Sequence, residues 1–76
     1  MPHIVIKMFP GRDEQAKKNL TDKIEQLFID ELGSSSDSLS IGIEEIESSE
    51  WMNTVAKPEI LDKKETITKM PGYEIK

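Results

Sequence analysis

The segments HIVIKMF (residues 3–9) and LSIGIEEI (residues 39–46) decide the fold of this chain. In both, apolar and often β-branched residues recur at every second position, which is typical of β-strands. The first segment carries apolar groups on both faces. The second has one apolar face, formed by Leu39, Ile41 and Ile43, and one small or polar face. We therefore predict two strands.

An amphipathic helix is predicted between the two strands. Asp13 can cap its start, because its carboxylate can accept a backbone N–H of the first turn, and Gly33 can end it in a left-handed conformation. Apolar residues spaced three and four apart form one stripe between these caps: Ala16, Leu20, Ile24, Leu27 and Phe28. A strand, a helix and a strand make a βαβ unit with parallel strands, so the predicted fold class is α/β.

The last third of the chain predicts a C-terminal helical extension. Ser48 or Ser49 can cap a short helix that carries Trp51 and Val55, and Pro58 is expected to interrupt or restart this helix. Three apolar residues then predict a further helical segment: Ile60, Leu61 and Ile67.

A chain of 76 residues without cysteine is expected to form a single domain over residues 1–76 and to associate with copies of itself. A domain of this size buries only about 60% of the surface of its unfolded chain, and disulfides are absent as a supplement. In addition, one helix covers only one face of a parallel strand pair, and both faces of such sheets are normally covered. A homo-oligomer is therefore predicted, with two βαβ units joining their sheets in a dimer.

The charge distribution argues against nucleic-acid and membrane partners. Ten basic residues stand against fifteen acidic ones, a net charge of −5, and the basic residues do not cluster. No apolar run approaches the roughly 18 residues of a membrane span. Because the start of the chain also lacks the pattern of a signal peptide, we expect a cytoplasmic location.

Few residues of the chain form a recognisable catalytic or metal-binding pattern. With one histidine and no cysteine, the chain has neither a histidine pair nor a thiolate site for a metal, and no glycine-rich phosphate loop is present. Glu44 and Glu45 point to opposite faces of a strand and cannot act as a pair. His3 fits the role of a structural strand residue. Pro2 is different, because removal of Met1 would expose a secondary amine there. Burial of an amine lowers its pKa, and a general base works best when its pKa lies near the working pH.

The order of these features resembles the tautomerase superfamily typified by 4-oxalocrotonate tautomerase. The resemblance rests on the run PHIVIKMFPGRDEQ (residues 2–15), the helix and the second strand, and it covers nearly the whole chain. It includes an N-terminal proline that opens a βαβ unit, a Gly-Arg pair before the helix, and Trp51 after the second strand. The opening MPHI, the Glu50-Trp51 pair and the closing PGY (residues 71–73) are similar to the PptA group within this family.

The resemblance implies a cofactor-free keto–enol tautomerase that acts on a small 2-oxo acid. Pro2 would carry the proton as general base, and Arg12 would hold the substrate carboxylate in a bidentate contact. Trp51 would form an apolar wall against a flat substrate. The alternatives are that Arg12 is a solvated surface residue and that Trp51 is a simple core residue.

One position departs from the family pattern. Ser40 stands where 4-oxalocrotonate tautomerase has a second arginine, and a hydroxyl cannot replace a positive charge opposite a dicarboxylate. The substrate is therefore expected to be a monocarboxylate with an aromatic or apolar tail, such as phenylpyruvate enol. Ser40 could donate one hydrogen bond to it.

Two other functions stay open from the sequence. In the first, a protonated Pro2 acts as an acid in hydration or dehalogenation of an unsaturated acid. In the second, the chain is a non-enzymatic oligomeric scaffold or binding protein, which a retained Met1 would favour because it converts the Pro2 nitrogen into an amide. As for assembly, shorter family members form hexamers, but residues 51–73 are long enough to cover the sheet, which favours a dimer.

Overall fold

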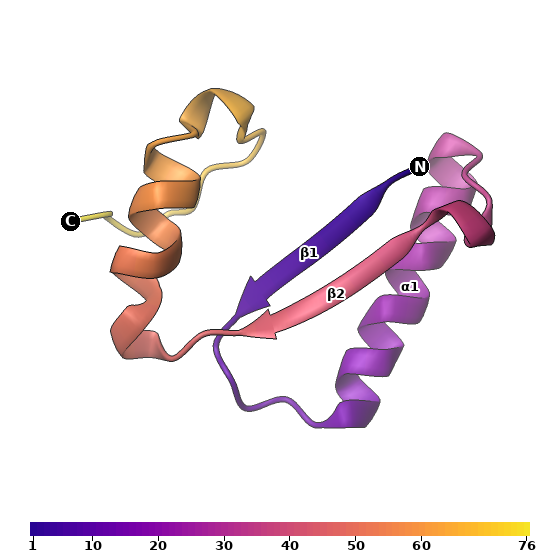
Figure 1. Cartoon of the computed structure of the whole chain (residues 1–76), viewed down its shortest axis with the longest axis horizontal. Helices are drawn as coiled ribbons and strands as arrows, with labels where there is room; N and C mark the ends of the chain where they lie inside the picture. The colour runs from indigo at the N-terminus through magenta and orange to yellow at the C-terminus, as the bar shows by residue number, and fades with distance from the viewer. The chain divides into compact units, whose positions relative to one another are not determined.

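The computed structural model describes residues 1–76 as two compact units, Met1–Glu45 and Ile46–Lys76. The first unit contains two strands, one long helix and one short 3-10 turn (Figure 1). In chain order these are β1 (His3–Met8), α1 (Glu14–Leu32), η1 (Ser36–Ser38) and β2 (Ser40–Glu45). The predicted α/β class and the βαβ order are confirmed.

The strands β1 and β2 pair in parallel, as the crossover requires. Ile4 lies opposite Ile41 and Ile6 lies opposite Ile43, so the branched apolar residues of both strands share one face. Each strand is slightly shorter than its alternating segment predicts, because pairing begins at His3 with Ser40 and ends at Met8 with Glu45.

Both predicted caps of α1 are confirmed. The backbone N–H of Ala16 donates to Oδ1 of Asp13 at 2.8 Å, which satisfies one of the free donors of the first turn. At the other end Gly33 adopts φ 65°, the left-handed region, and its N–H donates to the carbonyl of Ile29 at 3.0 Å. These caps set the length of α1 and hence the position of the loops at both ends of the sheet.

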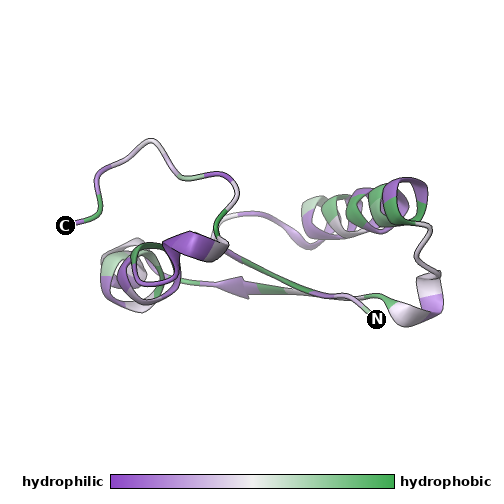
Figure 2. Cartoon of the chain, turned by 90° about the horizontal axis from the view of Figure 1, so that it is seen from above, coloured by the Kyte–Doolittle hydropathy of each residue, from purple (hydrophilic) through white to green (hydrophobic).

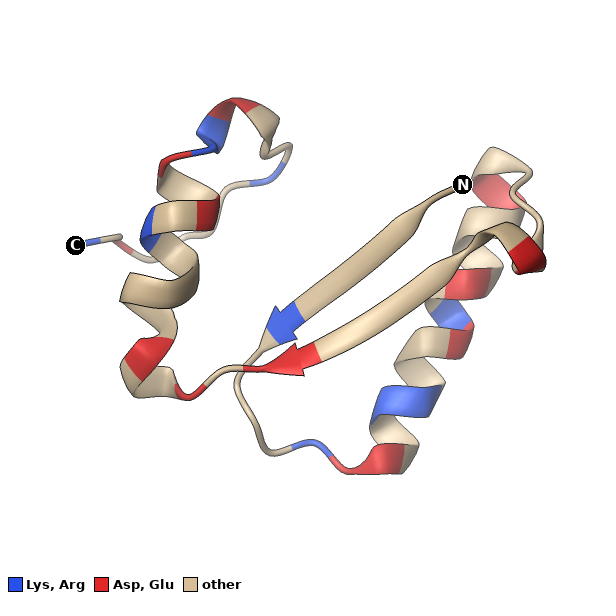
Figure 3. Cartoon of the chain, viewed as in Figure 1, with Lys and Arg blue, Asp and Glu red and all other residues tan.

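Helix α1 covers one face of the sheet, as the view along the sheet in Figure 2 shows. Nζ of Lys17 lies 3.0 Å from Oε1 of Glu45, so the face of β2 that carries Glu45, Ile43 and Ile41 is turned toward α1. The hydrogen bond to Glu45 raises the pKa of Lys17. Figure 3 shows charged residues along α1. On this helix, Nζ of Lys18 lies 2.8 Å from Oδ2 of Asp22.

No element of the first unit covers the opposite face of the sheet. This face carries the alternate residues of each strand: His3, Val5, Lys7, Ser40, Gly42 and Glu44. Val5 at its centre is 43% exposed. The sheet therefore has one face packed on α1 and one face on which no element of this unit lies.

Ile41 tests the assignment of the helix-facing side. Replacing Ile41 with aspartate puts a carboxylate between β2 and α1, and we expect the free energy of unfolding to fall by about 2–4 kcal/mol. Denaturant titration followed by circular dichroism measures this change. Ile41→Val is the matched control, with an expected loss of about 0.5–1.5 kcal/mol. An aspartate variant as stable as the wild type would contradict the assignment.

The second unit is helical. It contains a 3-10 turn η2 (Ser48–Glu50), a helix η3 (Met52–Leu61) and a last turn η4 (Lys64–Thr66). Its core is formed by Val55 and Ala56, the two buried apolar residues of the chain. The C-terminal helical extension is thereby confirmed. No helix of the structure has the length and apolar character needed to cross a bilayer.

Three details of this extension differ from prediction. Pro58 lies inside η3 and does not interrupt it. This helix is a π-helix, in which the N–H of Asp62 donates to the carbonyl of Lys57 at 2.9 Å. Because its hydrogen bonds are not of the i→i+4 type, proline does not disrupt a regular ladder at this position. The serine cap is also wrong, since Ser48 and Ser49 lie within η2, which begins after Glu47 without a side-chain cap.

The further helical segment that was predicted is mostly part of η3. Ile60 and Leu61 end that helix, and Ile67 follows the single turn η4. The threonines around Ile67 favour extended backbone, which agrees with the early end of the helical structure.

Candidate functional site

Pro2 is held at the start of the sheet by the backbone of β2. It is half-buried and directly precedes β1, and its carbonyl accepts a hydrogen bond from the N–H of Ser40 at 3.2 Å. This bond continues the ladder of the parallel strands by one residue. The position of Pro2 is therefore set by the paired strands, which are more rigid than a free terminus.

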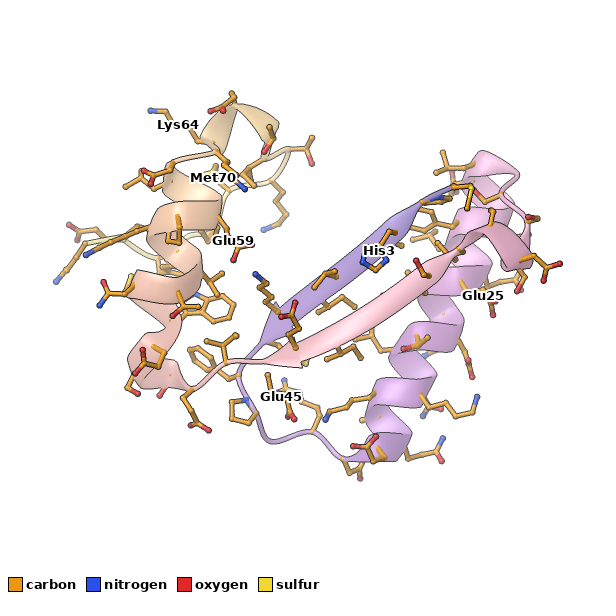
Figure 4. All side chains as sticks on the ribbon, in the orientation of Figure 1. His3, Glu25, Glu45, Glu59, Lys64 and Met70 are labelled. Carbon is orange, nitrogen blue, oxygen red and sulfur yellow. The ribbon has the colours of Figure 1, made fainter.

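Ser40 contacts the same end of β1 with its side chain. Its Oγ lies 2.6 Å from Nδ1 of His3, the residue with which it pairs in the sheet. Figure 4 shows the His3 ring beside β2. Both side chains are exposed and belong to the sheet face that no element of this unit covers. The structure thus brings together Pro2 and Ser40, two of the residues named for the site. It also places His3, which was not named for the site, beside them.

Arg12 lies at the other end of β1. It follows Gly11, whose φ of 131° is a conformation that side-chain-bearing residues rarely adopt, and precedes the helix cap Asp13. Pro2 and Met8 are separated by six residues of extended chain, or about 20 Å at the rise of a β-strand. In Figure 1 the loop from β1 to α1, which contains Arg12, lies at the end of the sheet opposite the N-terminus, so Arg12 and Pro2 of one chain do not meet.

Trp51 belongs to the second unit, where it precedes η3 and is half-buried. Its Nε1–H donates to Oη of Tyr73 at 2.9 Å, a contact between residues 22 positions apart in the sequence. This bond fixes the edge of the indole and ties the C-terminal segment to the start of η3. The contact of Tyr73 is within its own chain.

Two partners of the predicted site residues were not found from the sequence. His3 was interpreted as a structural strand residue, although the strand starts at residues 3 and 39 would have placed it close to Ser40 in a parallel pair. Tyr73 carried no local signal, because its contact with Trp51 depends on how the C-terminal turn folds back. Nowhere in the chain do three histidine, aspartate or glutamate side chains converge as a metal ion requires.

Comparison with known proteins decides the family. A family model described as tautomerase enzyme matches residues 2–56, and its match begins at Pro2. The chain belongs to the tautomerase family.

Its tautomerase relatives match over nearly their whole length. A probable tautomerase of Xylella fastidiosa is 36% identical over 73 residues, which are 96% of this chain and 89% of that protein. The tautomerase PptA of Escherichia coli is 40% identical over 76 residues, which are 99% and 100% of the two chains. The resemblance to tautomerases and to the PptA group is thereby confirmed.

The tautomerase fold is also found in a solved structure. The crystal structure of YwhB, a homologue of 4-oxalocrotonate tautomerase, superposes with a TM-score of 0.64 at 28% identity and covers 80% of this chain and 97% of the other. This chain is therefore an enzyme of the isomerase class, a tautomerase. The identity of its base and of its substrate is a separate question, which the geometry at Pro2 and Ser40 addresses.

Proposed function

We propose that this tautomerase converts the enol of a small 2-oxo acid, such as phenylpyruvate enol, into the keto form, with the amine of Pro2 as general base. The observation that carries the proposal is the position of Pro2. The family match begins at this residue, and the N–H of Ser40 holds its carbonyl at the start of the sheet. Once Met1 is removed, the Pro2 nitrogen is a secondary amine in a fixed place.

The reaction moves one proton and needs no redox step. The neutral amine of Pro2 takes the proton of the enol hydroxyl, and the enol oxygen becomes the carbonyl oxygen. The electron pair of the C=C bond then takes a proton from the prolinium at the neighbouring carbon, which regenerates the amine. A base of this kind works best when its pKa lies near the working pH.

The other candidate residues bind the substrate in this proposal. Arg12 pairs with the carboxylate, Trp51 packs against the aromatic tail, and the Ser40 hydroxyl donates to a substrate oxygen. Because Arg12 and Pro2 lie at opposite ends of β1, the Arg12 of one chain serves the Pro2 of another copy. The working unit is then a homo-oligomer, a dimer in the simplest case, in which residues 1–76 of each chain act as one domain.

The enol-to-keto conversion of phenylpyruvate tests this proposal. The ultraviolet absorbance of the enol falls as the keto form appears, and the protein is used after its intact mass has confirmed that Met1 is absent. We expect the rate to exceed the buffer rate in proportion to protein concentration. A rate equal to that of buffer would overturn the proposal, and turnover of an unsaturated acid by the same sample would point to Pro2 as an acid in hydration.

A further inference from the structure

His3 and Ser40 form a side-chain pair beside the proposed base. Oγ of Ser40 lies 2.6 Å from Nδ1 of His3, and the backbone N–H of Ser40 donates to the carbonyl of Pro2 at 3.2 Å. Ser40 is thus bonded to two successive residues, to Pro2 through its backbone and to His3 through its side chain. Both side chains of the pair are exposed, so a small ligand can reach the hydroxyl.

A serine hydroxyl has a single proton, and this limits what the pair can do. If the hydroxyl donates to Nδ1, it has no proton left for a substrate oxygen and presents only lone pairs, which repel an anion. If Nδ1 carries a proton and donates to Oγ, the hydroxyl proton is free to point at the ligand. The direction of the hydrogen bond between His3 and Ser40 therefore decides whether Ser40 can bind an anionic substrate.

We propose that His3 is a positioning residue that donates from Nδ1 to Ser40 and so directs the hydroxyl proton of Ser40 toward the carboxylate or the developing oxyanion of the substrate. This inference rests on the proposed function. The carboxylate itself favours this arrangement, because a hydroxyl that donates to an anion is a better acceptor for the N–H behind it. His3 touches no reacting atom and acts only through Ser40.

The protonation of Nδ1 is measured directly by nitrogen NMR. His3 is the one histidine of the chain, so all imidazole nitrogen signals belong to its ring, and their couplings to the two ring C–H protons distinguish Nδ1 from Nε2. The 15N shifts are recorded on protein without Met1, free and with saturating phenylpyruvate, the product of the proposed reaction. We expect the bound form to carry the proton on Nδ1. An unprotonated Nδ1 in the bound form would overturn the inference, whatever the activity of the protein.

Four variants separate positioning from a general structural effect. Ser40→Ala and His3→Ala are each expected to lower kcat/KM for phenylpyruvate enol by about three- to tenfold, the range of one hydrogen bond, mainly through a higher KM. The double variant is expected to lose no more than either single variant, because both changes remove the same donor. His3→Asn places an amide donor near the position of Nδ1 and is expected to remain within about twofold of the wild type.

These outcomes also distinguish failure of this inference from failure of the proposed function. If the wild type shows no tautomerase activity, the proposed function falls, and a role of His3 in that reaction falls with it. If the wild type is active but His3→Ala equals it, or His3→Asn is as impaired as His3→Ala, or the two alanine effects multiply, only the role of His3 is overturned. Circular dichroism of each variant confirms that the fold is retained.

Discussion

Replacing Pro2 with alanine is expected to lower kcat/KM for the enol of phenylpyruvate by about 10²- to 10⁴-fold, the contribution of a positioned general base. After Met1 removal, the alanine variant has a primary α-amine whose nitrogen is not held in a ring, so it retains a base that is less well fixed in position. The loss should appear mostly in kcat, because the binding residues are unchanged. Steady-state rates from ultraviolet absorbance measure it.

A chain that retains Met1 is the matched control for this prediction. Its residue 2 is still proline, but the nitrogen is an amide that does not accept a proton at neutral pH. We expect it to be as inactive as the Pro2→Ala variant, with the same thermal stability as the processed protein. Full activity in either sample would show that the base is another group.

Replacing Arg12 with glutamine is the second large effect that we expect. Loss of a charge-assisted pair with the substrate carboxylate should lower kcat/KM by about 10- to 150-fold, which corresponds to about 1.5–3 kcal/mol. The side chain is exposed and follows the glycine turn after β1, so the fold should be unaffected. Lys18→Gln on the outer surface of α1 is the control, with activity close to that of the wild type.

Mixing two inactive variants tests whether one site uses two chains. A mixed dimer of Pro2→Ala and Arg12→Gln chains has one site with both changes and one site with neither. Random pairing after joint unfolding and refolding makes about half of the dimers mixed, so about a quarter of the wild-type activity should return. Recovery no greater than the sum of the separate samples would contradict an Arg12 supplied by another copy.

The fold was predictable where local pattern decides it. Alternation in the two strands and the caps Asp13 and Gly33 specify the βαβ unit, because each depends on residues close together in the sequence. Pro58 was misjudged because the rule that it breaks a helix assumes i→i+4 bonding, and η3 has wider turns. The predicted serine cap was wrong because Ser48 and Ser49 lie within the 3-10 turn η2, which precedes η3.

The sequence suggested members for the candidate site but not how they are arranged. Pro2 and Arg12 are ten positions apart in sequence, and only the extended strand between them shows that they lie far apart in one chain. His3 and Ser40 are 37 positions apart, and only the strand register shows that they touch. The residue types suggested which reaction the side chains could support, while the distances between these side chains depend on how the strands pair.

The pairing of β1 with β2 also has a consequence for the order of events during translation. The bond from Ser40 to Pro2 joins residues 38 positions apart, so it cannot form until both strands have left the ribosome. Until then the first residues are an unpaired segment that an aminopeptidase can reach. Met1 stays exposed after the strands have paired, so its removal, on which the proposed base depends, can take place before or after folding.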